Sequence, residues 1–283
     1  MKLSSTLTVV GGTALALCLS PTHAQARSDG SNYSNVSVSD LVPGNISTDA
    51  IGTSLKSNTS TVPIGAKTYI AGLRPTIDGN NACTAALITP THILAATECV
   101  FGNIRWASIG SHYPNGTQDG EQIKVVAIFQ HPESTPNNFT NDFTIMTLEK
   151  PSSFKPVALA APDDSDIKDG EWAVKFGWDD TGGPDTKTNE LKRAEVQLMS
   201  NENCAKQTHV DGTMVCSRGV PNEKSCTGHY GGPLVVERST GDVVVGVTTW
   251  GDDCPKPGYP SKYSRVSSAL TWIKSIAGGE CFH

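Results

Sequence analysis

The stretch Cys226-Thr227-Gly228-His229-Tyr230-Gly231-Gly232-Pro233-Leu234 decides the fold of this chain. It is rich in glycine and passes directly into the apolar run Leu234–Val236, which is typical of a β-strand. Two of its residues carry chemistry, His229 and Tyr230. The phenol of Tyr230, with an ordinary pKa near 10, stays protonated at neutral pH and is a poor nucleophile.

Short β-rich runs alternate with turn signals on both sides of this stretch. The runs are Lys67–Gly72, Ala85–Ile88, Ile93–Ala96, Ile123–Phe129, Phe143–Leu148, Trp172–Gly177, Leu191–Leu198, Leu234–Val236 and Val243–Trp250. Only Ser267–Ile276 has helical spacing, and Gly278-Gly279 marks its end. The pattern predicts an all-β barrel or sandwich with a C-terminal helix.

The amino-terminal 61 residues differ in composition from the rest. Met1–Ala26 begins with Lys2, continues with an apolar run and ends in Ala-Gln-Ala, which predicts a cleaved secretory signal. Residues 27–61 are rich in Ser, Asn, Asp and Thr, and we expect a flexible leader. A cut before Ile51 is the alternative, but Asp49-Ala50 offers no basic residue to an activating protease.

Charge and sequons agree with export. The formal net charge of −6 argues against a nucleic acid or an anionic membrane as partner, because both need a basic face. No metal or cofactor is predicted. Candidate N-glycosylation sites are Asn32, Asn35, Asn45, Asn58, Asn115 and Asn138.

The stretch 226–234 resembles the nucleophile loop of trypsin-like and chymotrypsin-like serine proteases, C-x-G-D-S-G-G-P-L. Four other segments are similar to the family's motifs in the same order. They are Cys83–Cys99, Asn141–Leu148, Thr249–Gly251 and Tyr263–Val266. The resemblance implies that residues 62–283 form two six-stranded antiparallel β-barrels followed by a C-terminal helix.

The resemblance also implies three disulfides. These pair Cys83 with Cys99, Cys204 with Cys216, and Cys226 with Cys254. Loss of the signal removes Cys18, so Cys281 is left over, either free or capped, or linked to another chain.

The catalytic residues that the family needs are not conserved in type. The resemblance places Glu98 where the base histidine stands, Asp142 where the orienting aspartate stands, and Tyr230 where the serine stands. His229 takes the place of the aspartate that binds the freed amino terminus, and Lys224 lies at the pocket floor. Glu98 and Asp142 would face each other as two like charges, so we expect the pKa of one of these carboxyl groups to be raised or the two to share a proton. We expect no protease activity.

Among such degenerate homologues the chain is most similar to the glucanase inhibitor proteins of oomycete plant pathogens. The local likeness lies in Val62–Tyr69 and Thr89–Leu94. It implies secretion into the host apoplast and inhibition of host plant endo-β-1,3-glucanases, which suppresses the release of defence-eliciting glucan fragments.

We expect an interface of about 1,600 Å² in total, formed by loops around the former cleft. These loops are Ser111–Glu121, Asp179–Asn189 and Asp252–Tyr259. Two alternatives remain open. One is a pseudoprotease that binds cell-wall glucan through Trp106, Trp178 or Trp250, and the other is an active protease with a rearranged site.

Overall fold

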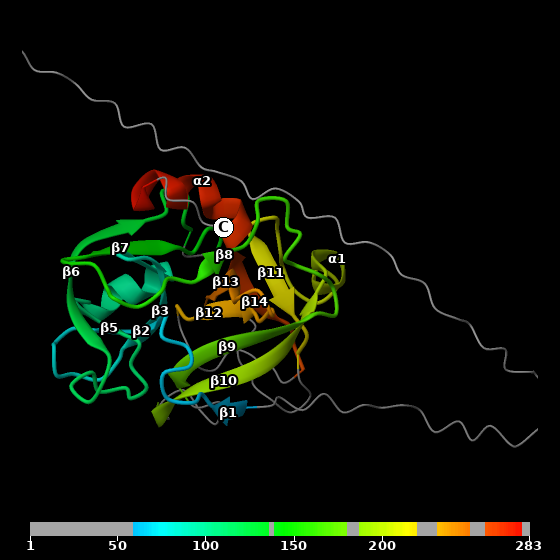
Figure 1. Cartoon of the computed structure of the whole chain (residues 1–283). Helices are drawn as coiled ribbons and strands as arrows, with labels where there is room; N and C mark the ends of the chain where they lie inside the picture. Colours follow the sequence, from blue (N-terminus) through cyan, green and yellow to red (C-terminus); the bar gives the residue numbers. More distant parts are fainter. Residues whose placement is uncertain (1–58, 136–138, 180–186, 220–230, 250–257, 279–283) are drawn as a thin grey trace, which may run out of the picture. The chain divides into compact units, whose positions relative to one another are not determined.

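The computed structural model describes residues 59–135, 139–179, 187–219, 231–249 and 258–278. Within these ranges the chain forms strands β1 to β14, a 3-10 helix and two α-helices (Figure 1). The strand-rich runs of the sequence are strands here, and Ser267–Ile276 lies within the C-terminal helix. Two closed barrels account for most of the strands.

The first barrel is closed by six antiparallel strands in the order β2-β3-β4-β7-β6-β5. Their bounds are β2 Ile70–Arg74, β3 Cys83–Thr89, β4 His92–Ala95, β5 Trp106–Ile109, β6 Glu121–Gln130 and β7 Thr144–Leu148. Alternation along β6 sets its faces, because Ile123 and Val125 are buried while Lys124 and Val126 are exposed. A register shift between Val125 and Ala127 in the β6–β7 pairing marks a bulge that bends the strand.

The second barrel is closed through the pairings β9-β10-β11-β14-β13-β12 and back to β9. Its strands are β9 Trp172–Asp179, β10 Lys187–Met199, β11 Met214–Ser217, β12 Pro233–Val236, β13 Val243–Thr248 and β14 Ser261–Arg265. The short strand β8, Ala158–Leu159, adds to β13 in parallel. The predicted class, two six-stranded antiparallel barrels with a C-terminal helix, is confirmed.

The helices lie at the ends of strands. The 3-10 helix η1 spans Thr97–Gly102, α1 spans Asn201–Cys204 and α2 spans Val266–Ala277. One face of α2 is buried through five apolar residues: Val266, Ala269, Leu270, Ile273 and Ala277. The Trp272 ring of α2 also lies 4.8 Å from the His131 ring at the end of β6. The C-terminal helix therefore contacts both barrels.

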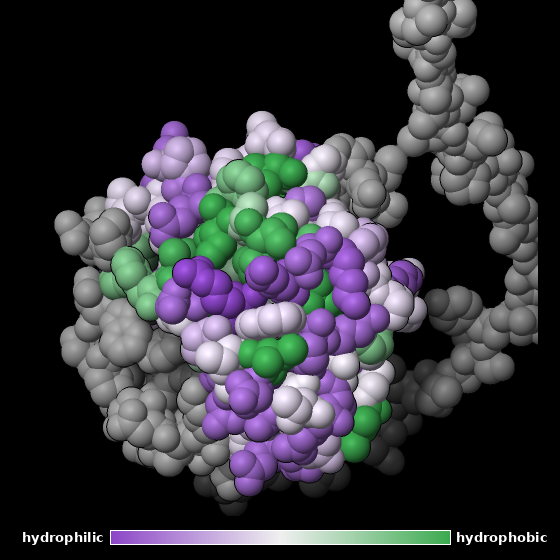
Figure 2. All heavy atoms as spheres, turned by 90° about the vertical axis from the view of Figure 1, so that its left-hand side faces the viewer, coloured by the Kyte–Doolittle hydropathy of each residue, from purple (hydrophilic) through white to green (hydrophobic). Residues whose placement is uncertain are grey.

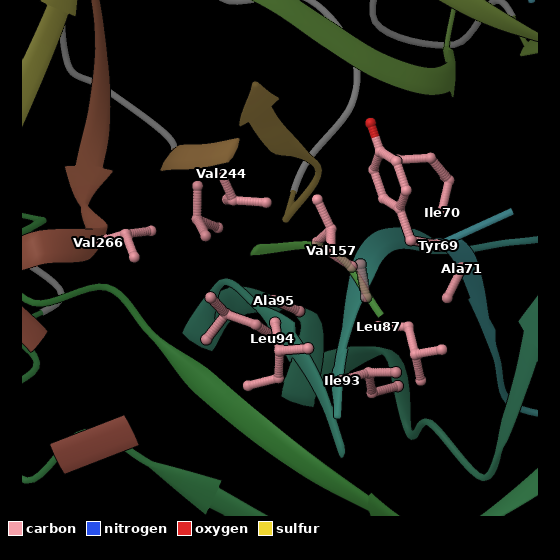
Figure 3. Close-up of a cluster of buried hydrophobic side chains, with 14 of the residues drawn as sticks. Tyr69, Ile70, Ala71, Leu87, Ile93, Leu94, Ala95, Val157, Val244 and Val266 are labelled. Atoms are coloured by element: carbon pink, nitrogen blue, oxygen red, sulfur yellow. The ribbon is translucent and has the colours of Figure 1, made fainter. Parts of the chain in front are cut away.

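A continuous apolar core joins the barrels (Figure 3). Val157, in the segment that links them, donates its N–H to the carbonyl of Leu87 in β3 at 3.0 Å. Three residues later, Ala160 donates to the carbonyl of Val244 in β13 at 3.0 Å. Figure 3 shows Val157 between the side chains of the two barrels, so the link is part of the core rather than a loose tether.

An amino-terminal arm, residues 59–69, runs from the second barrel to the first strand of the first barrel. Strand β1, Thr59–Thr61, pairs antiparallel with β10, and Val62 donates its N–H to the carbonyl of Leu191. The sequence-based boundary places residues 59–61 in the flexible leader, and the structure differs there. These three residues are exposed and carry no apolar signal, and pairing with β10 makes them a strand. Residues 1–58 lie outside the described part of the chain.

Candidate functional site

Asp142 is buried between the two barrels and is held by three hydrogen bonds. Its Oδ1 accepts from the N–H of Thr97 at 2.8 Å, and its Oδ2 accepts from the Thr249 hydroxyl. Its own N–H donates to Ser264 Oγ in β14 at 3.1 Å. Thr249 and Ser264 of the second barrel thus hold Asp142, which precedes β7 of the first barrel.

The carboxylate of Asp142 also starts helix η1. Ala96 at the helix N-cap offers no side-chain acceptor, so the first helical N–H, that of Thr97, has no intrahelical partner. Asp142 supplies the missing acceptor. The Thr97 hydroxyl donates to the carbonyl of Phe143 at 3.1 Å, which fixes the helix against the segment that enters β7. This role of Asp142 requires no catalysis.

Glu98 is the next residue of η1 and lies within electrostatic range of Asp142. Its Oε1 is buried without a hydrogen-bond partner among the described residues. Burial, together with the negative charge of Asp142, raises the pKa of Glu98 to about 8. Burial also raises the pKa of Asp142, but its hydrogen bonds from Thr249 and Thr97 oppose the rise.

These environments favour the proton of the pair on Glu98. The hydrogen bonds that the oxygens of Asp142 accept favour the ionised form of that carboxyl group. Glu98 carries the proton, because its Oε1 is buried without a hydrogen-bond donor among the described residues and the Asp142 carboxyl group lies nearby. A neutral carboxylic acid cannot accept a proton from a nucleophile, so Glu98, at the position of the base, offers no general base at neutral pH.

Gly231 brings the second barrel against this site. It has a φ of 73°, and a Cβ there would come within 2.6 Å of Cys99 Sγ and of the Thr84 carbonyl oxygen. Only glycine fits such a position. Tyr230, His229 and Lys224 lie outside the described residues, as does the Asp252–Tyr259 loop except for Gly258 and Tyr259.

Two of the disulfides implied by the resemblance are present. Cys83 and Cys99 are joined between β3 and η1, and Cys204 and Cys216 between α1 and β11. The first bond fixes the helix that carries Glu98. Cys226, Cys254 and Cys281 lie outside the described residues. Disulfides of this kind are typical of proteins that fold in an oxidising compartment.

One candidate glycosylation site can be placed. Asn115 Oδ1 accepts from the N–H of Thr117 at 3.0 Å and from its hydroxyl at 2.8 Å. The sites Asn32, Asn35, Asn45, Asn58 and Asn138 lie outside the described residues. Within the described ranges there is no group of three or more residues suited to bind a metal ion. No helix in this part of the chain is long and apolar enough to cross a membrane.

A groove of about 750 Å³ lies away from the carboxyl pair. It is bordered by the arm at Ala66–Tyr69, the linker at Lys155–Ala158 and the β12–β13 turn at Thr240–Val243. The Tyr69 hydroxyl in this groove donates to Asp242 Oδ2 at 2.7 Å. The polar groups of Tyr69 and Asp242 are therefore already paired with each other.

Sequence patterns do not reveal the partners of Asp142. Thr97, Thr249 and Ser264 come from three distant segments, and only the packing of the barrels brings them together. The motif Thr249–Gly251 marks the position of Thr249, but not its bond to Asp142.

Comparison with known proteins shows the family of this chain and several of its relatives. The family model described as Trypsin matches residues 56–273. Glucanase inhibitor protein 3 of Phytophthora infestans is 48% identical over 255 residues, which cover 87% of this chain and 98% of that protein. Glucanase inhibitor protein 1 of the same organism is 46% identical over 76% of this chain and 85% of that protein. Glucanase inhibitor protein 2 of Phytophthora sojae is 43% identical over 77% of each chain.

Proposed function

This chain belongs to the trypsin family, and from that premise we propose that it is a secreted, catalytically inactive member that binds and inhibits host plant endo-β-1,3-glucanases. The observation that carries the proposal is the identity of 43–48% to relatives named glucanase inhibitor proteins. Inhibition would suppress the release of the glucan oligosaccharides that elicit plant defence.

The absence of catalysis rests on chemistry at the carboxyl pair. Proteolysis by this family requires an imidazole base hydrogen-bonded to a serine and oriented by a carboxylate. Here the base position holds Glu98, which is protonated at neutral pH, and the serine position holds Tyr230. Only the carboxylate Asp142 remains, and its bonds to Thr97 and Thr249 give it a structural role.

The scaffold suits recognition by its surface. Two closed barrels and an apolar core that continues between them form the scaffold, and the Cys83–Cys99 bond ties η1 to β3. The Ser111–Glu121 loop is held in the same way, since Asp119 accepts from Ser111 Oγ at 2.6 Å and from the His112 N–H at 2.7 Å. Loops ordered before binding lose little entropy when a partner docks, which favours affinity.

An inhibition assay tests the proposal. Purified full-length secreted protein, with its glycans, is mixed with a plant endo-β-1,3-glucanase that hydrolyses soluble β-1,3-glucan. We expect inhibition that saturates at a one-to-one ratio, together with co-precipitation of the two proteins. Absence of binding at micromolar concentrations to a panel of apoplastic glucanases would remove the proposal.

Direct glucan binding is the first alternative, and the tryptophans offer it little support. Trp178 is 2% exposed and its indole N–H donates to the carbonyl of His112 at 2.9 Å, so it is a core residue. Trp106 is partly buried, and Trp250 lies outside the described residues. Sedimentation with insoluble β-1,3-glucan in the absence of plant protein tests this alternative.

A protease with a rearranged site is the second alternative. A fluorophosphonate probe labels an activated serine, and we expect no labelling of this chain. Labelling of any serine at the cleft would replace the inhibitor proposal by an enzymatic one.

We further propose the processing that secretion implies. Cleavage after residue 26 leaves the leader and the barrel domain in the extracellular space, the host apoplast. Glycans at some of the sequons, a Cys226–Cys254 bond and a disulfide partner for Cys281 belong to the same proposal. Intact-mass analysis before and after deglycosylation and reduction checks each of them.

A further inference from the structure

Asn115, in the loop between β5 and β6, begins the one glycosylation sequon that lies wholly within the described residues, Asn115-Gly116-Thr117. The amide of Asn115 is oriented by Thr117, whose N–H donates at 3.0 Å and whose hydroxyl donates at 2.8 Å. An N–H can only donate, so the atom that faces it is the oxygen Oδ1. The amide nitrogen Nδ2 has no hydrogen-bond partner in the described part of the chain and is not buried.

An N-linked sugar is attached at the atom that this loop leaves free. The reaction joins Nδ2 to the anomeric carbon of an oligosaccharide that is carried on a lipid diphosphate. The bond from that carbon to the diphosphate breaks, and the lipid diphosphate leaves together with one Nδ2 proton. The carbonyl oxygen of Asn115 is unchanged by the reaction, so both bonds from Thr117 persist in the glycosylated chain.

The backbone on either side of Asn115 is fixed to the first barrel. The Asn81 N–H donates to the carbonyl of Pro114 at 2.9 Å. Gly116 lies against the guanidinium of Arg74, which is fully buried, and a Cβ at Gly116 would overlap that group. A side chain at this position would lift the loop off the barrel, so glycine in the middle of the sequon fixes how the tip is presented.

The other side of the loop is held by Asp119 and Gln122. The carbonyl of Asp119 accepts from Gln122 Nε2 at 3.0 Å, and its carboxylate accepts from Ser111 and His112. Gln122 Oε1 in turn accepts from the Arg74 guanidinium. One buried cation thus lies beneath both sides of the loop, and the sequon is presented from a fixed support.

The surface around the tip is polar and open to water. Thr117, Gln118 and Gly120 are exposed. Figure 2, which views the side of the molecule where β5 and β6 lie, shows hydrophilic side chains over much of that face. A glycan is bulky and hydrated, and a polar surface of this kind accommodates it.

We propose that Asn115 carries an N-linked glycan in the secreted protein and that the tip of this loop, residues 115–117, faces the solvent when the glucanase is bound. The second part rests on the proposed function. It narrows the interface expected from the Ser111–Glu121 loop, because a partner that covered the tip would have to displace the water around the glycan. The contact with the glucanase is then left to surfaces that the glycan does not cover.

Mass spectrometry of peptides from the secreted full-length protein tests the first part. Peptide N-glycosidase converts a glycosylated asparagine to aspartate, and treatment in heavy-oxygen water labels that aspartate. We expect the label at residue 115 in most molecules. An unlabelled Asn115 would overturn the proposal and leave this residue only the role of closing a turn.

Variants of the sequon separate the glycan from the turn. Thr117→Ser keeps both the sequon and the hydroxyl that donates to Asn115, so the label should remain. Thr117→Ala removes the sequon and one of the two hydrogen bonds. Asn115→Asp removes the sequon but keeps an oxygen acceptor for Thr117. Neither of the last two should carry a glycan at this position, and thermal unfolding checks that each variant is folded.

The inhibition assay with these variants tests the second part. Asn115→Asp and Thr117→Ala should inhibit the glucanase within about threefold of Thr117→Ser, because the tip lies outside the interface. A larger change in either direction on loss of the glycan would show that the tip is part of the interface and overturn the second part. If residue 115 is labelled but the wild type inhibits no glucanase, the proposed function and the second part fail while the glycan assignment stands.

Discussion

The carboxyl pair of the cleft and the charged network of the arm differ in the sign of the charges that they bring together. Lys67 of the arm contacts Asp242 at 2.6 Å and Glu237 at 2.7 Å, and Glu237 also contacts Arg193 at 2.6 Å. Each charge in this network has an opposite neighbour. In the cleft, Glu98 and Asp142 place two acidic groups together between the barrels.

The comparison separates a network of paired opposite charges from a pair of neighbouring carboxyl groups. Burial lowers the pKa of Lys67, but hydrogen bonds and charges from Asp242 and Glu237 outweigh burial, so its pKa is raised and its charge is favoured. The cleft keeps the hydrogen bonds of Asp142, and burial with the charge of Asp142 raises the pKa of Glu98.

Removal of the Asp142 side chain should have the largest effect on stability. Asp142→Ala leaves the Thr97 N–H and the Thr249 hydroxyl without their acceptor in a buried site, which costs about 3 kcal/mol of unfolding free energy. Asp142→Asn keeps one acceptor and should lose less. Urea unfolding at pH 6 measures both, and a loss below about 0.5 kcal/mol for alanine would contradict the capping role.

The pH dependence of stability should follow Glu98. The folded chain binds the Glu98 proton up to about pH 8, whereas the unfolded chain releases it near 4.5. Stability is therefore highest below pH 4.5 as far as this group is concerned, and it falls as the pH rises toward 8. After allowance for partial solvent access, the fall is about 2 kcal/mol, and Glu98→Gln should remove most of it.

A second glutamate of opposite behaviour serves as the control for this pH profile. Burial raises the pKa of Glu121, but hydrogen bonds from Ser152 and Ser153 outweigh it and lower the pKa. Its contribution is present above its unfolded value and is lost as the pH falls. Glu121→Gln should thus leave the slope between pH 5 and 8 unchanged, and an equal slope in Glu98→Gln and wild type would refute the assignment of the proton.

Breaking the arm network should have a smaller effect. Asp242→Asn removes a charge that binds Lys67 Nζ and the Tyr69 hydroxyl, both partly shielded from water. The expected loss is about 1–2 kcal/mol, because the amide oxygen still accepts a hydrogen bond and Glu237 still neutralises Lys67. Thermal unfolding checks it, with Lys206→Gln as a control, whose pair with Glu202 is exposed.

Restoration of two catalytic residue types should have no effect. The double variant Glu98→His, Tyr230→Ser leaves His229 and Lys224 in place, so we expect neither casein hydrolysis nor fluorophosphonate labelling. Turnover by this variant would show that the cleft is one step from activity, which the comparison between the two charged regions does not predict.

Local patterns predict the long strands of this fold and its C-terminal helix. The runs 123–129 and 191–198 lie within β6 and β10, because burial on alternate residues leaves a period-two signal. The short strands β5, β11 and β14 are not predicted as strands, although β4 and β12, which are equally short, are predicted from their apolar runs. Strand β1 has no apolar residue at all, and it forms by pairing with β10, to which Thr61 also hydrogen-bonds through its side chain.

The sequence predicts which residues stand at the candidate site, but it does not predict the contacts that they make. The resemblance to serine proteases marks Glu98 and Asp142, but the pKa of Glu98 is raised first by burial and only second by the charge of Asp142. The capping of η1 by Asp142 depends on a contact across 45 residues, and the free Nδ2 of Asn115 is apparent only once its contacts are known. Spacing along the chain encodes neither of these.

The most direct test of the account is a titration of a plant endo-β-1,3-glucanase with the purified secreted protein, followed by the intact mass of the glucanase. The account predicts dose-dependent loss of glucan hydrolysis that saturates at one-to-one, with the glucanase mass unchanged. Full glucanase activity at micromolar inhibitor, or loss of activity accompanied by cleavage of the glucanase, would contradict it.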